Sequence, residues 1–540
     1  MRIVGRNNVT YYSAVLGDTL TIESSDGSFF GSSGDDSFYS TFSQVAFYGG
    51  LGNDSLSVEN GQCYIDGGAG NDLIYIGYGQ GSAYGGEGDD QITLVTGNGD
   101  LHGGAGSDIL RAYGGDAVLD GGDGNDALLL LGGHGQLLGG AGHDMLDTGY
   151  EAGLMVGGTG NDTYVVRHVD QVCAEATAEG FDTIRTDLEV YWVNFANIEC
   201  LVGTRETGQA LGGYANAIAL FGAGGADTLY SGGFDDWLDG GAGVDLMVGG
   251  DGNDIYVVDT AADICAETAT GGSDEIRTGL STYGIIVANI ERLVGIATSG
   301  QSLATDLGDQ TIIGNVGQDT LNAGRGNDTL DGGAGIDLLI GGEGNDVYLV
   351  DHANDICAET LGGGVDEIRT GLASFGVVVA NIERLVGTSA SGQSLATDLG
   401  SQTIVGNSGA DVLNAGRGDD TLIGGAGADT LFGGEGADLH LFDILDGNGD
   451  RIYGFVSGID SIGLAASTFG LSAGALDANR FVSTTANPAT AATQAFGQII
   501  YAAPIGDIYW DANGTAAGGL SWLGRTELVN ALTAQDFRVI

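Results

Sequence analysis

The chain has 540 residues, and its 73 acidic against 16 basic side chains give a net charge of −57. Its 103 glycines with only two prolines exclude collagen and proline-rich linkers, and a 42% hydrophobic content excludes a purely disordered polyelectrolyte. So acidic a chain repels nucleic acids and anionic lipid surfaces, and no apolar run in it is long enough to span a bilayer. We therefore expect cations as partners, since a halophile-type surface would scatter its acidic residues, whereas many of these recur in register.

Residues 1–30 are expected to form an N-terminal cap, and their start, MRIVGRNNVTYYSAVLGD, lacks the apolar segment of a secretory signal peptide. Between residues 31 and 166 the motif G-G-x-G-x-D then recurs with an 18-residue period. Its aspartates are Asp36, Asp54, Asp72, Asp90, Asp108, Asp126, Asp144 and Asp162. A fixed period that returns an oxygen ligand to the same place predicts a stack of turns with a column of hard-cation sites.

Each 18-residue turn divides into two nine-residue halves that share an apolar position and differ at the acidic one. The eighth position is apolar in the halves with the motif, as at Leu56 and Leu128, and in the other halves, as at Ile65 and Leu101. Both halves therefore predict a short strand with one side chain pointing inward. The sixth position carries Asp only in the halves with the motif. We expect metal along one edge, with about seven ions between stacked loops at a spacing of roughly 4.8 Å.

Residues 167–441 are predicted to hold three long repeats, because motif loops at residues 157, 249, 341 and 433 recur with a 92-residue period. Each repeat ends in a cassette of four nonapeptide-like segments, and here both edges carry Asp. Alternate segments share an edge, so aspartates one full turn apart are expected to stack. The pairs are Asp227 with Asp245, Asp236 with Asp254, Asp319 with Asp337, Asp328 with Asp346, Asp411 with Asp429, and Asp420 with Asp438. They would add about six ions.

The spacers between the cassettes contain short β-branched runs such as DEIRTGL and IERLVG, which predict strands rather than helices. We expect the solenoid to continue through them in wider, metal-poor coils; separate small domains joined by linkers are the alternative. The glycine loops stop near residue 442, and residues 442–540 are expected to form a β-rich cap that shields the last strand edge. The predicted fold class is all-β, a parallel β-solenoid.

The loop chemistry favours calcium over other metals. Calcium takes six to eight oxygen ligands, and the glycines allow turns that bring several backbone carbonyls to one point beside the Asp. Magnesium prefers a tighter octahedron that keeps its waters, and zinc prefers nitrogen or sulfur. Gly-Asp in a single copy would mark only a tight turn, but about twenty copies in register predict a cation cage. Because a site needs two stacked loops, ion binding and stacking become one event.

GGAGNDLIY at residue 67 and its copies resemble the nonapeptide of the RTX family, the hemolysin-type calcium-binding repeats, and the 92-residue unit resembles the long repeat of such bacterial proteins. The resemblance covers roughly residues 31–442. It implies a right-handed parallel β-roll that binds Ca²⁺, about 13 ions in all by the count of loops. It also implies export by type I secretion, which uses an uncleaved C-terminal signal, and GDRIYGFVSGIDSIGL and ALTAQDFRVI are similar to C-terminal segments of the family.

Three loops depart from the family motif. The loop at Ser231 lacks the fourth glycine, and Ala323 and Ala415 replace a first glycine, so we expect these loops to bind weakly. Outside the metal loops, Cys173, Cys265 and Cys357 occupy one repeat position and are expected to be small buried thiols.

Many members of the family also carry an enzyme or toxin domain, and none is visible in this sequence. The six histidines include no H-E-x-x-H pair, and the nearest approach to a G-x-S-x-G elbow, residues 519–523, ends in the wrong residue. His143 lies at a variable loop position and is expected to be exposed. Because repeats fill nearly all of the chain, we do not expect an enzyme; a hydrolase within residues 442–540 is kept as an alternative.

The sequence therefore predicts a secreted, extracellular or cell-surface protein whose β-roll folds on extracellular calcium, in a structural, surface or matrix role. The expected partners are calcium, the type I secretion apparatus, and either further copies of the chain or a cell-surface or matrix polymer. Nucleic acid and a transmembrane segment are not expected. The alternative is a calcium-dependent adhesin or binding module. An exposed aromatic or Asn/Thr ladder at 92-residue spacing would favour it, and Tyr283 and Phe375 are one such aligned pair, for which a place in the core is the preferred interpretation.

Overall fold

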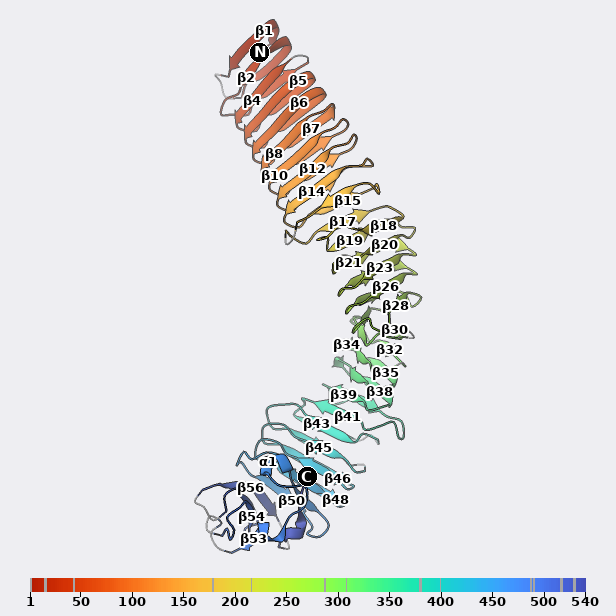
Figure 1. The fold of residues 1–540 in the computed structure, drawn as a ribbon, viewed down its shortest axis with the longest axis vertical. Coiled ribbons are helices and arrows are strands. Elements are labelled where there is room, and N and C mark those ends of the chain that lie inside the picture. Colours follow the sequence, from red (N-terminus) through yellow and green to blue (C-terminus); the bar gives the residue numbers. More distant parts are fainter. Residues whose placement is uncertain are drawn as a thin grey trace. The chain divides into compact units, whose positions relative to one another are not determined.

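The computed structural model describes residues 2–540 apart from residues 14–16, 42–43, 177–178, 215, 286–287, 307, 378–380, 399, 486–487, 489–490, 515–517 and 528–530. The regions predicted as end caps, residues 1–30 and 442–540, thus lie partly outside the described residues. The chain divides into two compact units, Met1–Ile276 and Arg277–Ile540. Both consist almost entirely of β-strands stacked as parallel rungs (Figure 1). Within the described residues, no helix is long and apolar enough to cross a membrane.

The first unit is built from two columns of parallel strands, one on each side of the coil. Four long strands run through both sides: β1 (Arg2–Tyr12), β2 (Thr19–Phe30), β5 (Ser55–Ala69) and β6 (Leu73–Glu87). One side also holds β3 (Ser37–Ser40), β7 (Gln91–Thr96), β9 (Ile109–Ala112), β11 (Ala127–Leu130), β13 (Met145–Asp147), β15 (Thr163–Val166), β17 (Thr183–Thr186), β19 (Cys200–Gly203), β21 (Ala219–Phe221), β24 (Trp237–Asp239) and β27 (Ile255–Val258).

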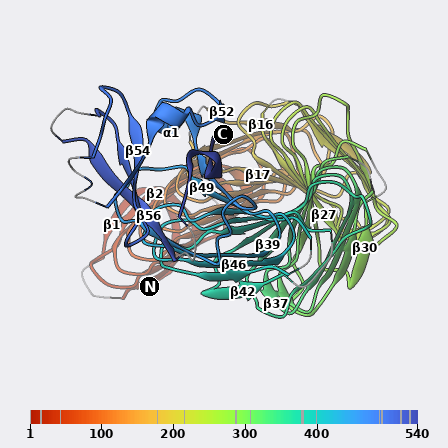
Figure 2. The same ribbon diagram turned by 90° about the horizontal axis from the view of Figure 1, so that it is seen from below.

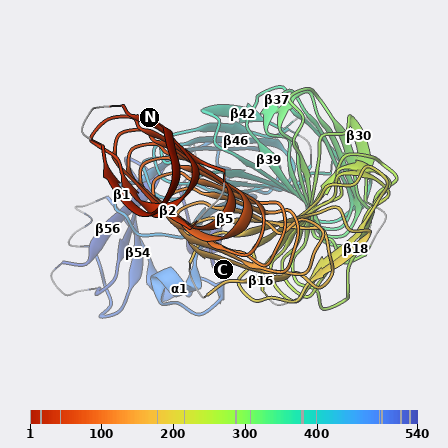
Figure 3. The ribbon, with the colours of Figure 1, turned by 90° about the horizontal axis from the view of Figure 1, so that it is seen from above.

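The other side holds β4 (Val45–Leu51), β8 (Asp100–Ala105), β10 (Val118–Asp123), β12 (Gln136–Ala141), β14 (Leu154–Thr159) and β16 (Val172–Ala174). A separate five-stranded sheet contains β18 (Val190–Val193), β20 (Ala210–Gly213), β23 (Thr228–Gly232), β26 (Leu246–Gly250) and β28 (Ile264–Ala266), beside the two-residue strands β22 (Gly224–Gly225) and β25 (Ala242–Gly243). Viewed from above, the turns that carry β1, β2 and β5 overlie one another (Figure 3).

The register of the first unit follows the 18-residue period. Leu128 of β11 pairs with Leu110 of β9 on one side and with Leu146 of β13 on the other. The predicted apolar columns are fully buried, at Phe38, Leu56, Ile74, Ile92, Leu110, Leu128, Leu146 and Tyr164 and at Phe47, Ile65, Ala83, Leu101, Leu119, Leu137 and Met155. Each large aliphatic side chain buried in this way contributes about 1.5–3 kcal/mol, so the stacked columns form the core.

The strand stack continues through the first spacer with altered turn lengths. Tyr164 pairs with Ile184, Ile184 with Leu201, and Leu201 with Leu220, so three successive turns all differ in length. The ordinary 18-residue turn then returns, with Leu220 paired to Leu238. Within this unit the spacer therefore continues the solenoid and does not form a separate domain. The expected widening of its coils is wrong for one turn, since Ile184 pairs with Leu201, 17 residues on.

The division between the units falls in β29 (Glu275–Thr278). One column of the second unit contains β31 (Arg292–Gly295), β33 (Thr311–Ile313), β36 (Thr329–Asp331), β39 (Val347–Val350), β41 (Glu367–Thr370), β43 (Arg384–Gly387), β45 (Thr403–Val405), β47 (Thr421–Ile423), β49 (Leu439–Phe442), β51 (Ser461–Leu464) and β57 (Phe537–Val539). Each pairs in parallel with the next, so the stack also continues through the third spacer.

The remaining sheets of the second unit cover its other faces. One holds β30 (Thr282–Gly284), β32 (Ser302–Ala304), β35 (Thr320–Arg325), β38 (Leu338–Glu343) and β40 (Ile356–Ala358), beside β34 (Val316–Gly317) and β37 (Ala334–Gly335). The other runs through β42 (Ser374–Gly376), β44 (Ser394–Ala396), β46 (Val412–Arg417), β48 (Thr430–Glu435), β50 (Asp450–Tyr453), β56 (Leu520–Glu527), β55 (Asp507–Asp511), β54 (Gln498–Ala502) and β53 (Phe481–Thr484). Phe375 of β42 is buried and Tyr283 of β30 is half-buried.

The C-terminal end departs from the parallel pattern. Strand β55 pairs antiparallel with both β54 and β56. The single described α-helix, α1 (Ala466–Phe469), lies beside these blue strands in Figure 2, and its Phe469 ring meets the Trp510 ring of β55 edge-on. The short elements β52 (Gly474–Ala475), η1 (Ala478–Arg480) and η3 (Ala534–Asp536) complete this end. A β-rich cap thus follows the last parallel turns, as predicted.

Candidate metal sites

The motif loops owe their shape to glycine. In the loop at residues 85–90, Gly86 and Gly88 have φ angles of 122° and 119°, in the region that side-chain-bearing residues rarely adopt. Gly85 faces a different constraint, because a Cβ at its position would overlap Asp90 Oδ2 and would lie 2.5 Å from the carbonyl oxygen of Gly103 in the next loop. The first glycine therefore leaves a space that a carboxylate and a neighbouring carbonyl oxygen share.

The motif aspartates form a continuous ladder along the edge of the first unit. Asp72 N–H donates a hydrogen bond to Asp90 Oδ1 at 2.7 Å, and Asp90 N–H donates to Asp108 Oδ1 at 2.7 Å. The same bond links each member of the series Asp36, Asp54, Asp72, Asp90, Asp108, Asp126, Asp144 and Asp162 to the next, at 2.6–2.8 Å. Each of these residues is at most 2% exposed. One carboxylate oxygen of each is thus used by the fold itself.

The second carboxylate oxygen is the one available to a ligand. Oδ2 is buried and meets no hydrogen-bond donor among the described residues at Asp54, Asp72, Asp90, Asp108, Asp126, Asp144, Asp162, Asp245, Asp254, Asp328, Asp337, Asp346, Asp420, Asp429 and Asp438. A buried carboxylate oxygen without a partner is costly, and in the loops that keep a first glycine it points into the space beside that glycine. The donor set of carboxylate and carbonyl oxygens fits a hard divalent cation such as calcium.

The remaining predicted ligands are the first motif aspartates of their ladders, and their Oδ2 contacts differ from those above. Oδ2 accepts a backbone N–H from Ser32 at Asp36, from Ala223 at Asp227, from Asn315 at Asp319 and from Asn407 at Asp411. In all four loops the donor stands where other loops have their second glycine. Asp236 is also buried, and its loop contains Ser231, whose hydroxyl donates to the Gly249 carbonyl. The loops with Ala323 and Ala415 keep an unpartnered Oδ2, at Asp328 and Asp420, within the described part of the chain.

The six predicted pairs in the cassettes are stacked as the 18-residue period requires. The N–H of the first member donates to Oδ1 of the second at 2.7–3.0 Å in every pair, from Asp227 and Asp245 to Asp420 and Asp438. Both edges of these turns therefore carry a ladder of the kind found on one edge of residues 31–166.

Burial changes the acidity of these carboxyls. Loss of solvent raises the pKa of Asp54 and Asp90 to about 7, with neighbouring carboxylates adding to the effect, and raises the pKa of Asp72 and Asp108 to about 6. Near neutral pH the sites therefore favour any species that supplies positive charge, either protons or a cation.

The ladders extend further than the motif. Asp18 N–H donates to Asp36 Oδ1, and the later ladders end on aspartates outside the G-G-x-G-x-D motif. These are Asp182, Asp263, Asp274, Asp355, Asp366, Asp450 and Asp460. The sequence could have indicated Asp263 and Asp355 as ladder members, since each keeps the 18-residue period from a motif aspartate. Asp182, Asp274 and Asp366 lie two positions beyond that period and break it.

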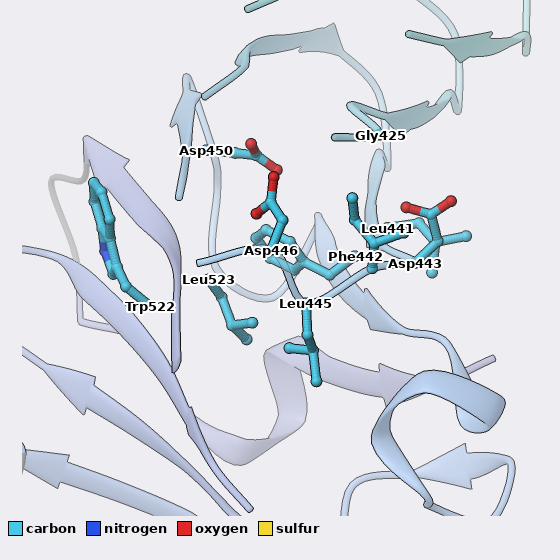
Figure 4. Close-up of a pocket in the computed structure, with 10 residues that line it drawn as sticks. Gly425, Leu441, Phe442, Asp443, Leu445, Asp446, Asp450, Trp522 and Leu523 are labelled. Carbon is cyan, nitrogen blue, oxygen red and sulfur yellow. The ribbon is translucent and has the colours of Figure 1, made fainter. Parts of the chain in front are cut away.

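A small pocket marks one such end. Its lining includes Asp443, Asp446, Asp450, Trp522 and Leu523, and Figure 4 shows the carboxylates of Asp446 and Asp450 facing each other. Asp450 Oδ1 accepts the N–H of Asp429 at 3.1 Å, and Asp446 Oδ2 accepts the N–H of Gly427 at 2.8 Å. These carboxylates thus complete the ladder of the last cassette.

The space beside the first glycine of each loop gives a direct prediction for Gly103→Ala. A Cβ there would overlap Asp108 Oδ2 and lie 2.5 Å from the Gly121 carbonyl oxygen. We expect overpacking to lower the free energy of unfolding by about 1–3 kcal/mol. The calcium concentration at the midpoint of folding, measured by circular dichroism, should rise. Gly114→Ala is the matched control, since its Cβ would meet only the Val95 carbonyl oxygen at 3.9 Å. Equal calcium midpoints for the two variants would contradict a role for this space in ion binding.

The sequence expectations for the cysteines and for His143 are met. All five cysteines are buried and unpaired, and His143 is exposed. In comparisons with known proteins, a family model described as the RTX calcium-binding nonapeptide repeat matches residues 30–62, 48–80, 95–128, 221–256, 305–339, 313–348, 326–355 and 405–439. The chain matches none of the curated proteins with which it was compared.

Proposed function

Since the chain carries the calcium-binding nonapeptide repeats of the RTX family, we propose that it is a secreted protein whose β-roll folds on extracellular calcium. We propose a structural, surface or matrix role for the folded protein. The observation that supports calcium-gated folding is the ladder of buried aspartates whose Oδ2 atoms lack a donor within the described residues. The 20 predicted motif aspartates are the proposed ligands.

Folding and ion binding are coupled because each site needs oxygens from two turns. Oδ2 of Asp90 and the carbonyl oxygen of Gly103 approach the same space, although they belong to successive loops. An ion therefore holds a turn to its neighbour, and a turn without its neighbour offers only part of a site. Extracellular calcium modules bind with dissociation constants of roughly 10⁻⁴–10⁻³ M, so the chain would stay open where calcium is scarce and close outside the cell.

The net charge of −57 supports the same coupling. About 13 calcium ions, the number proposed from the loops, would offset nearly half of that charge. Before folding, the self-repelling chain remains extended, which suits export by a type I apparatus. After folding, neutralised edges allow the turns to stack closely.

The repeats fill most of the chain, an architecture typical of structural or binding proteins, and this supports a matrix or surface role over a catalytic one. We expect the purified protein to form ordered sheets or filaments when millimolar calcium is added, visible by negative-stain electron microscopy. Magnesium at the same concentration is the control. A persistent monomer in calcium would count against the matrix role.

One observation favours a calcium-dependent adhesin as the second candidate. Rings stack along one face of the first unit, from Tyr12 to Phe30 at 4.9 Å and from Phe30 to Tyr48 at 4.6 Å between centroids. Tyr64, Tyr84 and His102 continue the series. Tyr12 is 69% exposed and Tyr64 is 37% exposed. Such a row offers apolar ring edges to a glycan or a cell surface, and a calcium-loaded monomer with this face free would support the adhesin.

A further inference from the structure

Three clusters of carboxylates each combine one motif aspartate with two acidic residues outside the repeated loop motif. In each of them, one oxygen from each of three acidic side chains lies within 4.8 Å of the other two. The clusters are Asp162 with Glu175 and Asp182, Asp254 with Glu267 and Asp274, and Asp346 with Glu359 and Asp366. Corresponding members recur with the 92-residue period, so the arrangement belongs to the long repeat.

Each cluster lies where a run of motif loops ends. Glu175 aligns with Gly157 of the turn before it, the place where another loop would have put its first glycine, since Met155 pairs with Cys173 and Val156 with Ala174. A Cβ on Gly157 would overlap both Asp162 Oδ2 and Glu175 Oε1. The glutamate side chain thus folds back into the space that, inside the stack, a carbonyl oxygen of the next loop approaches.

A tyrosine positions the glutamate. The Tyr164 hydroxyl donates to Glu175 Oε1 and accepts the N–H of Gly157 at 2.7 Å. Asp182 is also held, because its Oδ1 accepts the N–H of Asp162 at 2.8 Å and its N–H donates to Glu199 Oε2 at 2.9 Å. The same tyrosine contacts recur at Tyr256 with Glu267 and at Tyr348 with Glu359.

A second observation points to a ligand at the clusters. Asp162, Asp254 and Asp346 are 1%, 0% and 0% exposed, and their Oδ2 atoms have no hydrogen-bond donor in the described parts of the chain. Each Oδ2 points at the glycine that the cluster surrounds. The three carboxylates of a cluster, one of which has a buried oxygen without a donor, repel one another unless a cation lies between them.

The fourth copy of the long repeat provides an internal comparison. Its loop at residues 433–438 has His440 where the other three copies have the tyrosine. Phe432 pairs with Tyr453, so the residue that aligns with Gly433, where the other copies have the glutamate, is Gly454. The turn also lengthens, because Leu431 pairs with Ile452 and not with Gly449, as the ordinary period would require. The tyrosine and the glutamate are therefore replaced together, as expected of residues that serve one site.

We propose that each of the three clusters binds one calcium ion and so closes its stack of loops with side-chain oxygens in place of a further loop. Three oxygens that lie within 4.8 Å of one another can all bind one calcium ion, whose oxygen ligands lie at roughly 2.4 Å. The inference rests on the calcium binding proposed above and raises the expected total from about 13 ions to about 16.

Anomalous scattering from crystals of the full chain soaked in terbium locates the ion sites in the protein with its own sequence. Peaks within bonding distance of Glu175, Glu267 and Glu359, in addition to peaks in the motif loops, are the expected result. Peaks in the loops with the three clusters vacant would overturn this inference and leave the proposed function standing. Vacant loops and vacant clusters together would overturn the proposed function itself.

A variant tests the same sites in solution. E175Q/E267Q/E359Q is expected to bind three fewer calcium ions per chain in equilibrium dialysis, one for each cluster, while circular dichroism in saturating calcium still shows a folded chain. E151Q/E189Q/E206Q is the matched control, since it removes the same charge from exposed glutamates outside the clusters and loops. An unchanged ion count in the cluster variant contradicts the proposal. The single variants E175Q, E267Q and E359Q, each expected to lose one ion, decide the matter if the triple variant does not fold.

Discussion

Removal of calcium from the purified protein is expected to abolish most of its strand signal in far-ultraviolet circular dichroism, and renewed addition of calcium to restore it. At about 10 mM calcium and a dissociation constant of roughly 10⁻³ M, each site contributes about 1.4 kcal/mol to folding. About 13 such sites together exceed the roughly 5–15 kcal/mol that stabilises an ordinary domain. Without the ions, the buried Oδ2 atoms of the ladders lose the charge that compensates them.

Two controls accompany the chelation experiment. Magnesium at the same concentration is expected to restore little strand signal, because the loops offer an oxygen set suited to a larger, more flexible coordination shell. Sodium chloride tests whether screening of the negative charge is sufficient by itself. A strand signal that survives chelation unchanged would contradict calcium-gated folding.

Acid is expected to replace calcium in part. In chelated protein, lowering the pH from about 8 to about 5 should restore a measurable share of the strand signal. Loss of solvent raises the pKa of Asp54, Asp90, Asp144 and Asp254 from the ordinary value of 3.8 to about 7 in the folded chain. Between these two values the folded state binds more protons than the unfolded state. Its stability therefore rises as the pH falls below about 7 and is lost as the pH rises through that value.

The acid titration is measured by circular dichroism in the presence of chelator and is stopped near pH 5, above the isoelectric point of about 4.1. With calcium present, the same titration is expected to run in the opposite direction, because protons compete with the ions for the same carboxylates. A chelated protein that stays unfolded at pH 5, or that gains as much structure from salt at pH 8, would show that the ladder carboxyls do not control the transition.

The sequence predicted the parallel solenoid and the stacked aspartates because both depend on a strict period. An apolar residue such as Leu110 or Leu128 at the eighth position of each half-turn can be buried in only one register, and that register also aligns the aspartates. Where the period breaks, prediction failed. Turns of unequal length follow one another in the first spacer and bring Asp182 beside Asp162, and no local motif encodes those lengths.

The clusters at the stack ends were missed for a related reason. Glu175 is not preceded by the glycines that mark the other sites, and its role depends on Tyr164 and Asp182, which belong to no common motif with it. Its recurrence as Glu267 and Glu359 was visible, but repetition alone does not distinguish a ligand from a surface residue. The antiparallel pairing of β55 was also beyond prediction, because the C-terminal sequence has no period from which a register can be inferred.

The parallel pairing of β9, β11, β13 and β15 has a mechanical consequence. Force applied to the chain at one end of such a stack pulls on the outermost rung alone, because each rung is bonded only to the two beside it. The rungs would then detach one after another, each releasing one 18-residue turn, or about 60 Å of extended polypeptide. A tether built in this way absorbs a sudden load in small steps and reseals when the tension is relaxed.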